Sequence, residues 1–344
     1  MEDKELELKY RNLQATNEYL LKRINKLQSH NKFGYTIGAV IDKAVHVKDK
    51  GIESLKNRRI KREVLKFHKD GFNTTEKREK KIIVSLTSYA ERLKYVPAVI
   101  GSLLMQTVKP DKIILWLGKE NPQNRNLPKV FSTLIDYGLE IRYRPDIRTH
   151  TKWFYAFKEF PEDLIITVDD DVVYENTIIE KLYGTHIKYP NEIPALRVHR
   201  IRFQDDAALR DYNDWDWEYS AQKGAASHQF FATGVGGVLY TPSIINPEAL
   251  KLNNIKKYCP TQDDAWLKIM EVLSGVRVVL ADNISKTNGF TISGTQKTAL
   301  WKTNVKLGGN DKQIQDILTL YNNWFGNGEL LTEIMALDKI SKGN

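Results

Sequence analysis

The amino-acid sequence predicts an α/β domain with a largely parallel sheet, preceded by a helical N-terminal extension. From residue 81 onward, apolar runs of four to eight residues alternate with helical-period segments, a pattern typical of strands joined by crossover helices. The first 80 residues carry a heptad repeat and many basic side chains instead. With 344 residues the chain is long enough for one large domain and a smaller appendage.

The N-terminal segment, residues 1–33, predicts a coiled-coil helix. Leucines recur every seven residues, and a second set of positions follows each of the first three leucines by four residues. These positions are Leu6, Leu13, Leu20 and Leu27, and Tyr10, Asn17 and Ile24. A polar Asn17 at a buried coiled-coil position fixes a parallel two-stranded register, so we expect a homodimer. A single amphipathic helix packed on its own domain is the alternative.

Residues 34–80 predict a basic, amphipathic helical linker. Residues 1–81 hold 21 Lys and Arg against 12 Asp and Glu, which accounts for the whole net charge of +9. An apolar helical face within residues 35–47, followed by basic residues, suits the surface of an anionic membrane; a solvated linker is the alternative. In bZIP proteins the basic region precedes the zipper. Here it follows, so we expect no nucleic-acid partner.

The apolar runs expected to form strands in the main domain, residues 81–344, are 81–86, 112–117, 139–144 and 164–168, with a helix through 96–104. We divide this domain into a nucleotide-binding part at about 81–190, an acceptor part at about 191–300 and a helical segment at about 301–344. Parallel sheets bind ligands at the carboxyl ends of their strands. Functional residues are therefore expected just after each strand.

Three adjacent carboxylates, Asp169, Asp170 and Asp171, directly follow the apolar run 164–168. Neighbouring like charges repel one another unless a positive charge lies between them. A hard divalent cation with oxygen ligands relieves this repulsion, and diphosphate oxygens complete its coordination. We expect Asp169 and Asp171 to be the metal ligands; a solvated turn or helix N-cap near Glu175 is the alternative.

A second acidic pair, Asp263 and Asp264, opens a predicted helix that runs to about Leu273. One of the two carboxylates is expected to be the general base that deprotonates an acceptor hydroxyl, because a like-charged neighbour raises a carboxylate pKa. Thr261 and Asp264 also fit a capping box, which is a structural alternative.

Three further segments carry candidate binding residues. The loop of Thr87, Tyr89 and Arg92 offers groups that suit a nucleoside and its phosphate, although Ser88 and Glu91 fit a capping box. Lys152 is placed to neutralise diphosphate, or is a solvated helix lysine. The remaining candidates are Arg197 and His199, for phosphate or acceptor hydroxyls, and the glycine-rich segment 233–240, for close approach to a ligand or a turn.

The composition restricts the compartment in which the protein works. Cys259 is the single cysteine, so a disulfide framework is excluded and a reducing compartment is expected. The N-terminus lacks an apolar signal segment. The longest uncharged apolar stretches, 96–108 and 232–247, are shorter than the roughly 20 residues of a membrane span. We expect a cytoplasmic protein, with peripheral contact to the membrane's inner face through the basic helix.

Five successive motifs resemble those of bacterial GT-A glycosyltransferases and are similar to the family-2 group, whose members build capsular and other surface polysaccharides. They are SLTSYAERL, SLLMQTVKPDKIILWLG, ITVDDDVVY, GVGGVLYTP and TQDDAWLKIM, within residues 81–320. The resemblance implies a GT-A, Rossmann-like nucleotide-diphospho-sugar transferase domain. It further implies a metal-dependent, inverting hexosyltransferase that uses a nucleotide-sugar donor, with a UDP-sugar favoured, and a glycan or lipid-linked acceptor.

The resemblance also implies roles for individual residues. Asp169 to Asp171 would be a DxD motif that holds Mn²⁺ or Mg²⁺ and the donor diphosphate, and Asp264, or else Asp263, would be the base. The Thr87–Arg92 loop and Asp146 would contact the nucleotide, together with Lys152. Gly236 and Gly237 would border the donor and acceptor sugars. We also place Trp266, Arg197 and His199 in this acceptor and sugar pocket. A triple-Asp motif also resembles exostosin-like retaining enzymes.

Two other functions compete with this interpretation. A metal-dependent nucleotidyl- or phosphotransferase would use the same Asp cluster, although the chain lacks a GxxxxGK[ST] loop. A non-catalytic scaffold would only bind the sugar nucleotide, and it would not need both the Asp cluster and Asp264.

Overall fold

The protein is described by a computed structural model, which covers Lys66, residues 70–292, Thr295, residues 309–326 and residues 330–343. Residues 67–344 form one compact unit. The predicted coiled coil and most of the basic linker lie outside the described residues. The homodimer and the membrane contact therefore stay predictions.

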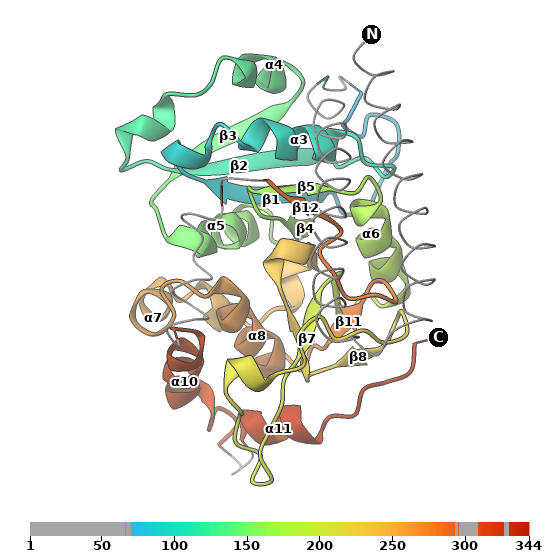
Figure 1. Ribbon diagram of the computed structural model, residues 1–344, viewed down its shortest axis with the longest axis vertical. Helices are drawn as coiled ribbons and strands as arrows, with labels where there is room; N and C mark the ends of the chain where they lie inside the picture. Colours follow the sequence, from blue (N-terminus) through green and yellow to red (C-terminus); the bar gives the residue numbers. More distant parts are fainter. Residues whose placement is uncertain (1–65, 67–69, 293–294, 296–308, 327–329, 344) are drawn as a thin grey trace, which may run out of the picture. The chain divides into compact units, whose positions relative to one another are not determined.

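The central sheet positions the site. Among the described residues it has eight strands, in the order β3 (Leu139–Arg144), β2 (Lys112–Gly118), β1 (Ile82–Ser88), β4 (Leu164–Thr167), β10 (Val238–Tyr240), β6 (Ile193–Ala195), β11 (Val278–Leu280) and β8 (Ala226–Ser227). The first four strands are parallel, whereas β10 pairs antiparallel with both β4 and β6. This mixed α/β architecture agrees with the GT-A, Rossmann-like class predicted from the sequence (Figure 1).

Two small antiparallel ladders accompany the sheet. β5 (Val172–Tyr174) pairs with β12 (Gly289–Thr291), and β7 (Val198–Arg200) pairs with β9 (Phe230–Ala232). Since β5 begins directly after Asp171, the acidic triplet is a link between two strands. It is not the start of a helix near Glu175.

Helices pack against the sheet and, near the C-terminus, against one another. In chain order the described α-helices are α3 (Val96–Leu104), α4 (Val130–Asp136), α5 (Thr151–Glu159), α6 (Ile178–Lys188), α7 (Leu252–Tyr258), α8 (Asp263–Leu273), α10 (Gly309–Tyr321) and α11 (Leu331–Leu337). α5 packs against β1, β2 and β4, and α6 packs against β6 and β10. The C-terminal helices α10 and α11, red in Figure 1, pack against α8. None of the described helices combines the length and the hydropathy needed to cross a bilayer.

Strand β1 is apolar because it lies in the middle of the sheet, where neighbouring elements leave almost none of it exposed. Its one fully buried polar side chain, Ser85, has two partners. The Ser85 hydroxyl donates to the backbone carbonyl of Lys152 and accepts a hydrogen bond from Trp116 Nε1 at 2.7 Å. A buried hydroxyl needs such partners, and these contacts fix the start of α5 against β1.

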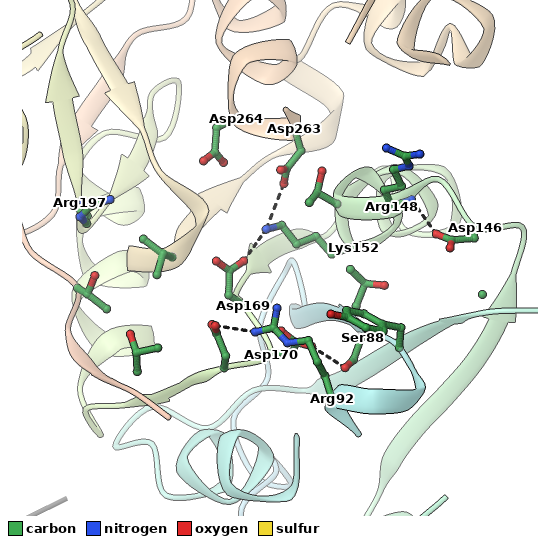
Figure 2. A pocket seen from close by; sticks show the side chains of 18 of the residues that line it. Ser88, Arg92, Asp146, Arg148, Lys152, Asp169, Asp170, Arg197, Asp263 and Asp264 are labelled. Atoms are coloured by element: carbon green, nitrogen blue, oxygen red, sulfur yellow. Dashed lines mark hydrogen bonds and ion pairs between the residues drawn. The ribbon is translucent and has the colours of Figure 1, made fainter. Parts of the chain in front are cut away.

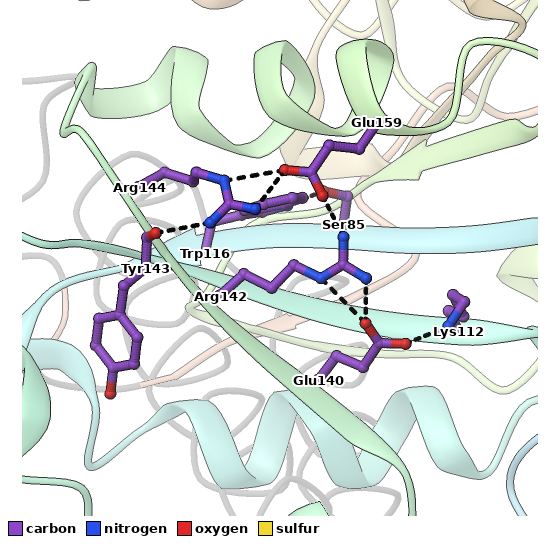
Figure 3. A network of polar contacts seen from close by, with 8 residues as sticks. All are labelled: Ser85, Lys112, Trp116, Glu140, Arg142, Tyr143, Arg144 and Glu159. Atoms are coloured by element: carbon purple, nitrogen blue, oxygen red, sulfur yellow. Dashed lines mark hydrogen bonds and ion pairs between the residues drawn. The ribbon is translucent and has the colours of Figure 1, made fainter.

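The edge strand β3 is covered by a network of charged side chains (Figure 3). Glu140 pairs with Lys112 and Arg142, and Glu159 of α5 pairs with Arg142 and Arg144. Charged side chains on an edge strand discourage pairing with another chain. The network therefore protects the open side of the sheet, at partly exposed positions where each ion pair contributes little to stability.

We expect Glu159→Gln to lower the free energy of unfolding by less than about 1 kcal/mol, because it weakens partly solvated ion pairs. Ile165→Ala should lower it by about 2–5 kcal/mol, because Ile165 is fully buried in β4. Urea denaturation of both variants measures the difference. An effect of Glu159→Gln as large as that of Ile165→Ala would show that the edge network is a main source of stability.

Candidate active site

A cavity of about 760 Å³ lies at the carboxyl ends of β1 and β4 and at the first turn of α8 (Figure 2). Many of the side chains that line it are charged. Its lining includes Thr87, Tyr89, Arg92, Asp146, Lys152, Asp169, Asp170, Asp171, Arg197, His199, Asp263 and Asp264. Candidate residues from five separate parts of the sequence thus meet at one cavity.

The Asp cluster is held by residues that follow β1. Arg92 Nη2 lies 2.9 Å from Asp170 Oδ1 and 2.6 Å from Asp171 Oδ2. Ser88 donates a hydrogen bond to Asp170 Oδ2, so Ser88 and Glu91 do not form the capping box that was the alternative. Burial raises the pKa of Asp170 to about 7, although Arg92 and Ser88 oppose the shift. Burial and Asp169 also raise the pKa of Asp171.

Lys152 connects the two acidic groups. Its Nζ lies 2.7 Å from Asp169 Oδ1 and 3.1 Å from Asp263 Oδ2. The side chain is 7% exposed, and α5 carries it into the cavity. Burial disfavours the charged ammonium, but the neighbouring carboxylates outweigh burial and raise the pKa of Lys152 well above its ordinary value. Lys152 is therefore protonated and is not a solvated helix lysine.

Asp263 and Asp264 both line the cavity from the first turn of α8, which begins without a side-chain cap. Thr261 bonds to Gln313 and not to α8, so the alternative capping box does not form. The backbone N–H of Gly234 donates to Asp264 Oδ1 at 3.0 Å. Burial and the Asp263 carboxylate raise the pKa of Asp264 well above its ordinary value, with Lys152 opposing them.

The glycine that lies against the acidic groups is Gly234. The prediction that Gly236 and Gly237 belong to the pocket is wrong. A Cβ on Gly234 would lie 2.9 Å from Lys152 Nζ and 3.2 Å from Asp264 Oδ1. Gly236 instead packs on Arg197, whose Cβ would be 2.5 Å from an added Cβ. Gly237, with φ of +92°, starts the turn into β10. Neither Gly236 nor Gly237 lines the cavity.

One end of the cavity gathers the residues predicted to contact the nucleotide. Thr87, Tyr89 and Asp146 line it, and Asp146 Oδ1 accepts a hydrogen bond from the backbone of Arg148 at 2.7 Å. Arg148 also lines the cavity, but the sequence analysis did not identify it. Its φ of +59° is uncommon for a residue other than Gly, and no local sequence pattern predicts it.

The other end of the cavity contains Arg197 and His199. Arg197 pairs with Glu218 at 2.9 Å and donates to Thr233 Oγ1 at 3.0 Å. Burial lowers the pKa of His199 to about 3, so its imidazole is neutral. Trp217 and Tyr212 complete this end and were not identified from the sequence.

The prediction for Trp266 is wrong. Trp266 is fully buried in the hydrophobic core, and its Nε1 donates to the carbonyl of Ala249 at 3.0 Å. It occupies the buried side of α8, whereas Asp264, two residues earlier, faces the cavity.

Asp169 and Asp171 are the candidate ligands for a divalent cation that a bound phosphate would share. They supply hard carboxylate oxygens at the cavity wall, and in this structure they pair with Lys152 and Arg92. In the described part of the chain, no three His, Cys, Asp or Glu side chains form a complete metal cage. Mg²⁺ in nucleotide sites typically uses one or two carboxylates plus substrate phosphates, so two carboxylates meet that requirement.

Comparisons with known proteins give distant likenesses. No protein-family model and no curated protein matches the chain. Among solved structures, it is similar to S. aureus TarS residues 1–349 in complex with UDP, with 10% identity, 72% of each chain covered and a TM-score of 0.42. A second similar structure is glucosyl-3-phosphoglycerate synthase from Mycobacterium tuberculosis in complex with Mn²⁺, UDP-glucose and phosphoglyceric acid. The identity is 14%, the match covers 34% of this chain and 43% of that chain, and the TM-score is 0.27. The chain is also similar to CMP:2-keto-3-deoxy-manno-octonic acid synthetase with CTP. The identity is 9%, the match covers 67% of this chain and 100% of that chain, and the TM-score is 0.39.

We expect Lys152→Met to lower the free energy of unfolding by about 3–5 kcal/mol at pH 7, because it leaves the buried Asp263 and the partly buried Asp169 without their cation. Lys152 also opposes the raised pKa of Asp264, so without Lys152 this pKa rises further above the unfolded value of about 3.9. The destabilising effect of Asp264 is therefore present at neutral pH and disappears as the pH falls through its raised pKa.

Urea denaturation between pH 7 and pH 4.5 tests this prediction. The matched control is Lys158→Met, which removes an exposed lysine from the same helix and should change stability little. The assigned charge balance would be contradicted if Lys152→Met were as stable as the wild type at pH 7. It would also be contradicted if the loss of unfolding free energy became larger as the pH is lowered.

Proposed function

We propose that this chain is a metal-dependent glycosyltransferase. It would transfer a sugar from a nucleoside-diphosphate sugar, with a UDP-sugar favoured, to a glycan or lipid-linked acceptor in bacterial surface-polysaccharide synthesis. One observation carries the proposal. The acids after β4 and the acids at the start of α8, 92 or more residues apart in sequence, line one cavity and are joined through Lys152.

The donor would occupy the end of the cavity nearest the strand ends. Thr87, Tyr89 and Arg148 line the space for the nucleoside. Asp169 and Asp171 would hold Mn²⁺ or Mg²⁺ together with the donor diphosphate. Such a cation neutralises negative charge that develops on the leaving diphosphate.

Asp264 is the proposed general base. Asp263 has a carboxylate oxygen committed to Lys152 at 3.1 Å, whereas Asp264 is oriented by the backbone of Gly234. The raised pKa of Asp264 makes it a stronger base than an ordinary carboxylate. Removal of the acceptor proton by Asp264 would accompany attack on the anomeric carbon, in an inverting displacement of the nucleoside diphosphate.

Binding of nucleotide and metal tests the donor site. We expect one nucleoside diphosphate, with UDP favoured, to raise the melting temperature in the presence of Mn²⁺, because a ligand of the native state stabilises it. Asp171→Ala should abolish this shift and lower turnover by about 10³-fold or more. Asp205→Ala, which changes an aspartate outside this cavity, is the control and should behave as wild type.

Wild-type turnover by a folded Asp171→Ala variant would contradict the metal assignment. If the folded protein binds no nucleotide with Mn²⁺ present, the donor site itself is wrong, and a scaffold without this chemistry becomes the better interpretation.

Asp264→Asn tests the base. We expect it to keep donor binding and to lower the rate of transfer by about 10²–10⁴-fold. Because the base acts only when deprotonated, wild-type kcat/KM should fall as the pH drops through the raised pKa of Asp264, above the ordinary value of about 3.9. This acidic limb should disappear in Asp264→Asn.

The products of turnover decide between reaction classes. Release of a nucleoside diphosphate with transfer of the sugar supports the glycosyltransferase. Release of inorganic diphosphate would identify a nucleotidyltransferase instead. If Asp263→Asn loses transfer while Asp264→Asn retains it, Asp263 is the base.

A further inference from the structure

We propose that Trp217 forms an aromatic platform on which the ring of an uncharged acceptor sugar stacks. This inference rests on the proposed function and names the class of molecule that its acceptor end takes. The platform is the indole of Trp217 with the rings packed behind it, those of His199, Tyr212 and Phe231.

Trp217 presents apolar carbon to a cavity that is also lined by charged residues. Its side chain lines the cavity, and the residue is 44% exposed. The indole Nε1 donates to the carbonyl of Tyr212 at 3.2 Å, so the polar edge of the ring already has a partner. What the indole offers to a ligand is therefore its ring surface.

A stack of aromatic rings fixes the indole from behind. The rings of Trp217 and His199 are 5.0 Å apart and inclined by 22°, and those of His199 and Phe231 are 6.5 Å apart and inclined by 5°. Tyr212 contacts Trp217 edge-on at 5.5 Å. His199 is 1% exposed and neutral, so it supports the stack without introducing a charge at the cavity.

The backbone next to Trp217 is specified as tightly as the rings. Glu218 has a φ of +51°, an uncommon conformation for this residue type. In this conformation its N–H donates to His199 Nδ1 at 3.0 Å, and its carboxylate pairs with Arg197 at 2.9 Å. Unfavourable backbone conformations persist where surrounding contacts determine them. The orientation of the platform is thus built into the fold.

The platform lies at the end of the cavity that faces away from the nucleoside residues. Figure 2 shows Arg197 across the cavity from Asp146 and Arg148, with Lys152 and Asp169 between them. Arg197 is joined to Glu218, the neighbour of Trp217. Tyr212, Trp217 and Asp264 line the same cavity, and the Asp264 carboxylate adds to the effect of burial in raising the pKa of Tyr212.

The chemistry of this end matches a sugar ring. The face of an aromatic ring is electron-rich and attracts the polarised C–H groups on one face of a pyranose, while hydroxyls at the rim remain able to reach Asp264. Because Arg197 is paired with Glu218, this end offers balanced charge. That balance favours a neutral sugar over a phosphorylated or acidic one.

Saturation-transfer NMR on the full-length protein, in the presence of UDP and the diamagnetic ion Mg²⁺, tests the platform. The probes are the methyl glycosides of glucose, galactose, mannose and N-acetylglucosamine. We expect at least one glycoside to receive saturation on the C–H protons of one ring face. Trp217→Ala should weaken its binding about tenfold, which corresponds to about 1.4 kcal/mol, and Trp217→Phe should restore most of the binding.

Two controls separate this test from that of the proposed function. Trp324→Ala removes an exposed tryptophan outside the cavity and should leave all signals unchanged. Saturation of the UDP ring protons should be the same in wild type and Trp217→Ala. Absence of any UDP signal would contradict the proposed function. Normal UDP binding with no glycoside signal, or with glycoside binding that is unaffected by Trp217→Ala, would overturn the platform alone.

A third outcome identifies a different occupant. If Trp217→Ala abolishes the UDP ring signal while glycoside binding persists, the indole stacks on the nucleobase and the platform proposal is wrong. Trp217→Phe guards against a folding artefact, since it keeps an aromatic ring at the same position. Its thermal unfolding should match that of the wild type.

Discussion

The charge of Lys152, buried between Asp169 and Asp263, is the interaction on which the rest of the site depends. Several carboxylates lie around one cavity, and without a cation their mutual repulsion and desolvation would oppose folding. The ammonium needs a fixed backbone to stay there. The hydroxyl of Ser85 supplies part of that support by donating to the Lys152 carbonyl, and Trp116 in turn donates to Ser85. The centre of the sheet and the centre of the site are therefore one connected structure.

These contacts join the two halves of the domain. Lys152 and Asp169 belong to the parallel half of the sheet, whereas Asp263 opens a helix of the second half. The Gly234 segment, which precedes the antiparallel strand β10, completes the contact by donating to Asp264. A donor bound at one half and an acceptor bound at the other would thus approach the same group of charges.

The charges of the two ends of the cavity are organised differently. At the Asp cluster, Arg92 lies between Asp170 and Asp171, so charged groups dominate this end. At the opposite end, the pairing of Arg197 with Glu218 and the neutral ring of His199 leave aromatic surface as the main feature. The first end is rich in charge and the second in aromatic surface, and this difference is the basis of the proposed charged donor and neutral acceptor.

The sequence alone predicted the parts of the fold and the site that depend on local pattern. β1, β2 and β4 are largely apolar because the sheet around them is covered on both faces, whereas the edge strand β3 alternates apolar and charged residues. All four parallel strands were found to within two residues. The Asp cluster and the acid pair were found because carboxylates directly after a strand or at a helix start are visible as short motifs. β6, β10 and β11 have three residues each, too few to show a period.

The tertiary structure decided which neighbours of these motifs face the cavity. Trp266 follows Asp264 by two residues but points into the core, because residues two apart lie on different faces of a helix. Gly234, and not Gly236, meets the acids, since a local turn sets which glycine approaches them. Trp217 reaches the cavity only through the left-handed conformation of Glu218 and its contacts with distant residues. The sequence gives the type of each residue and the local periodicity of apolar residues. The direction in which a side chain points depends on contacts between segments that are far apart in the chain.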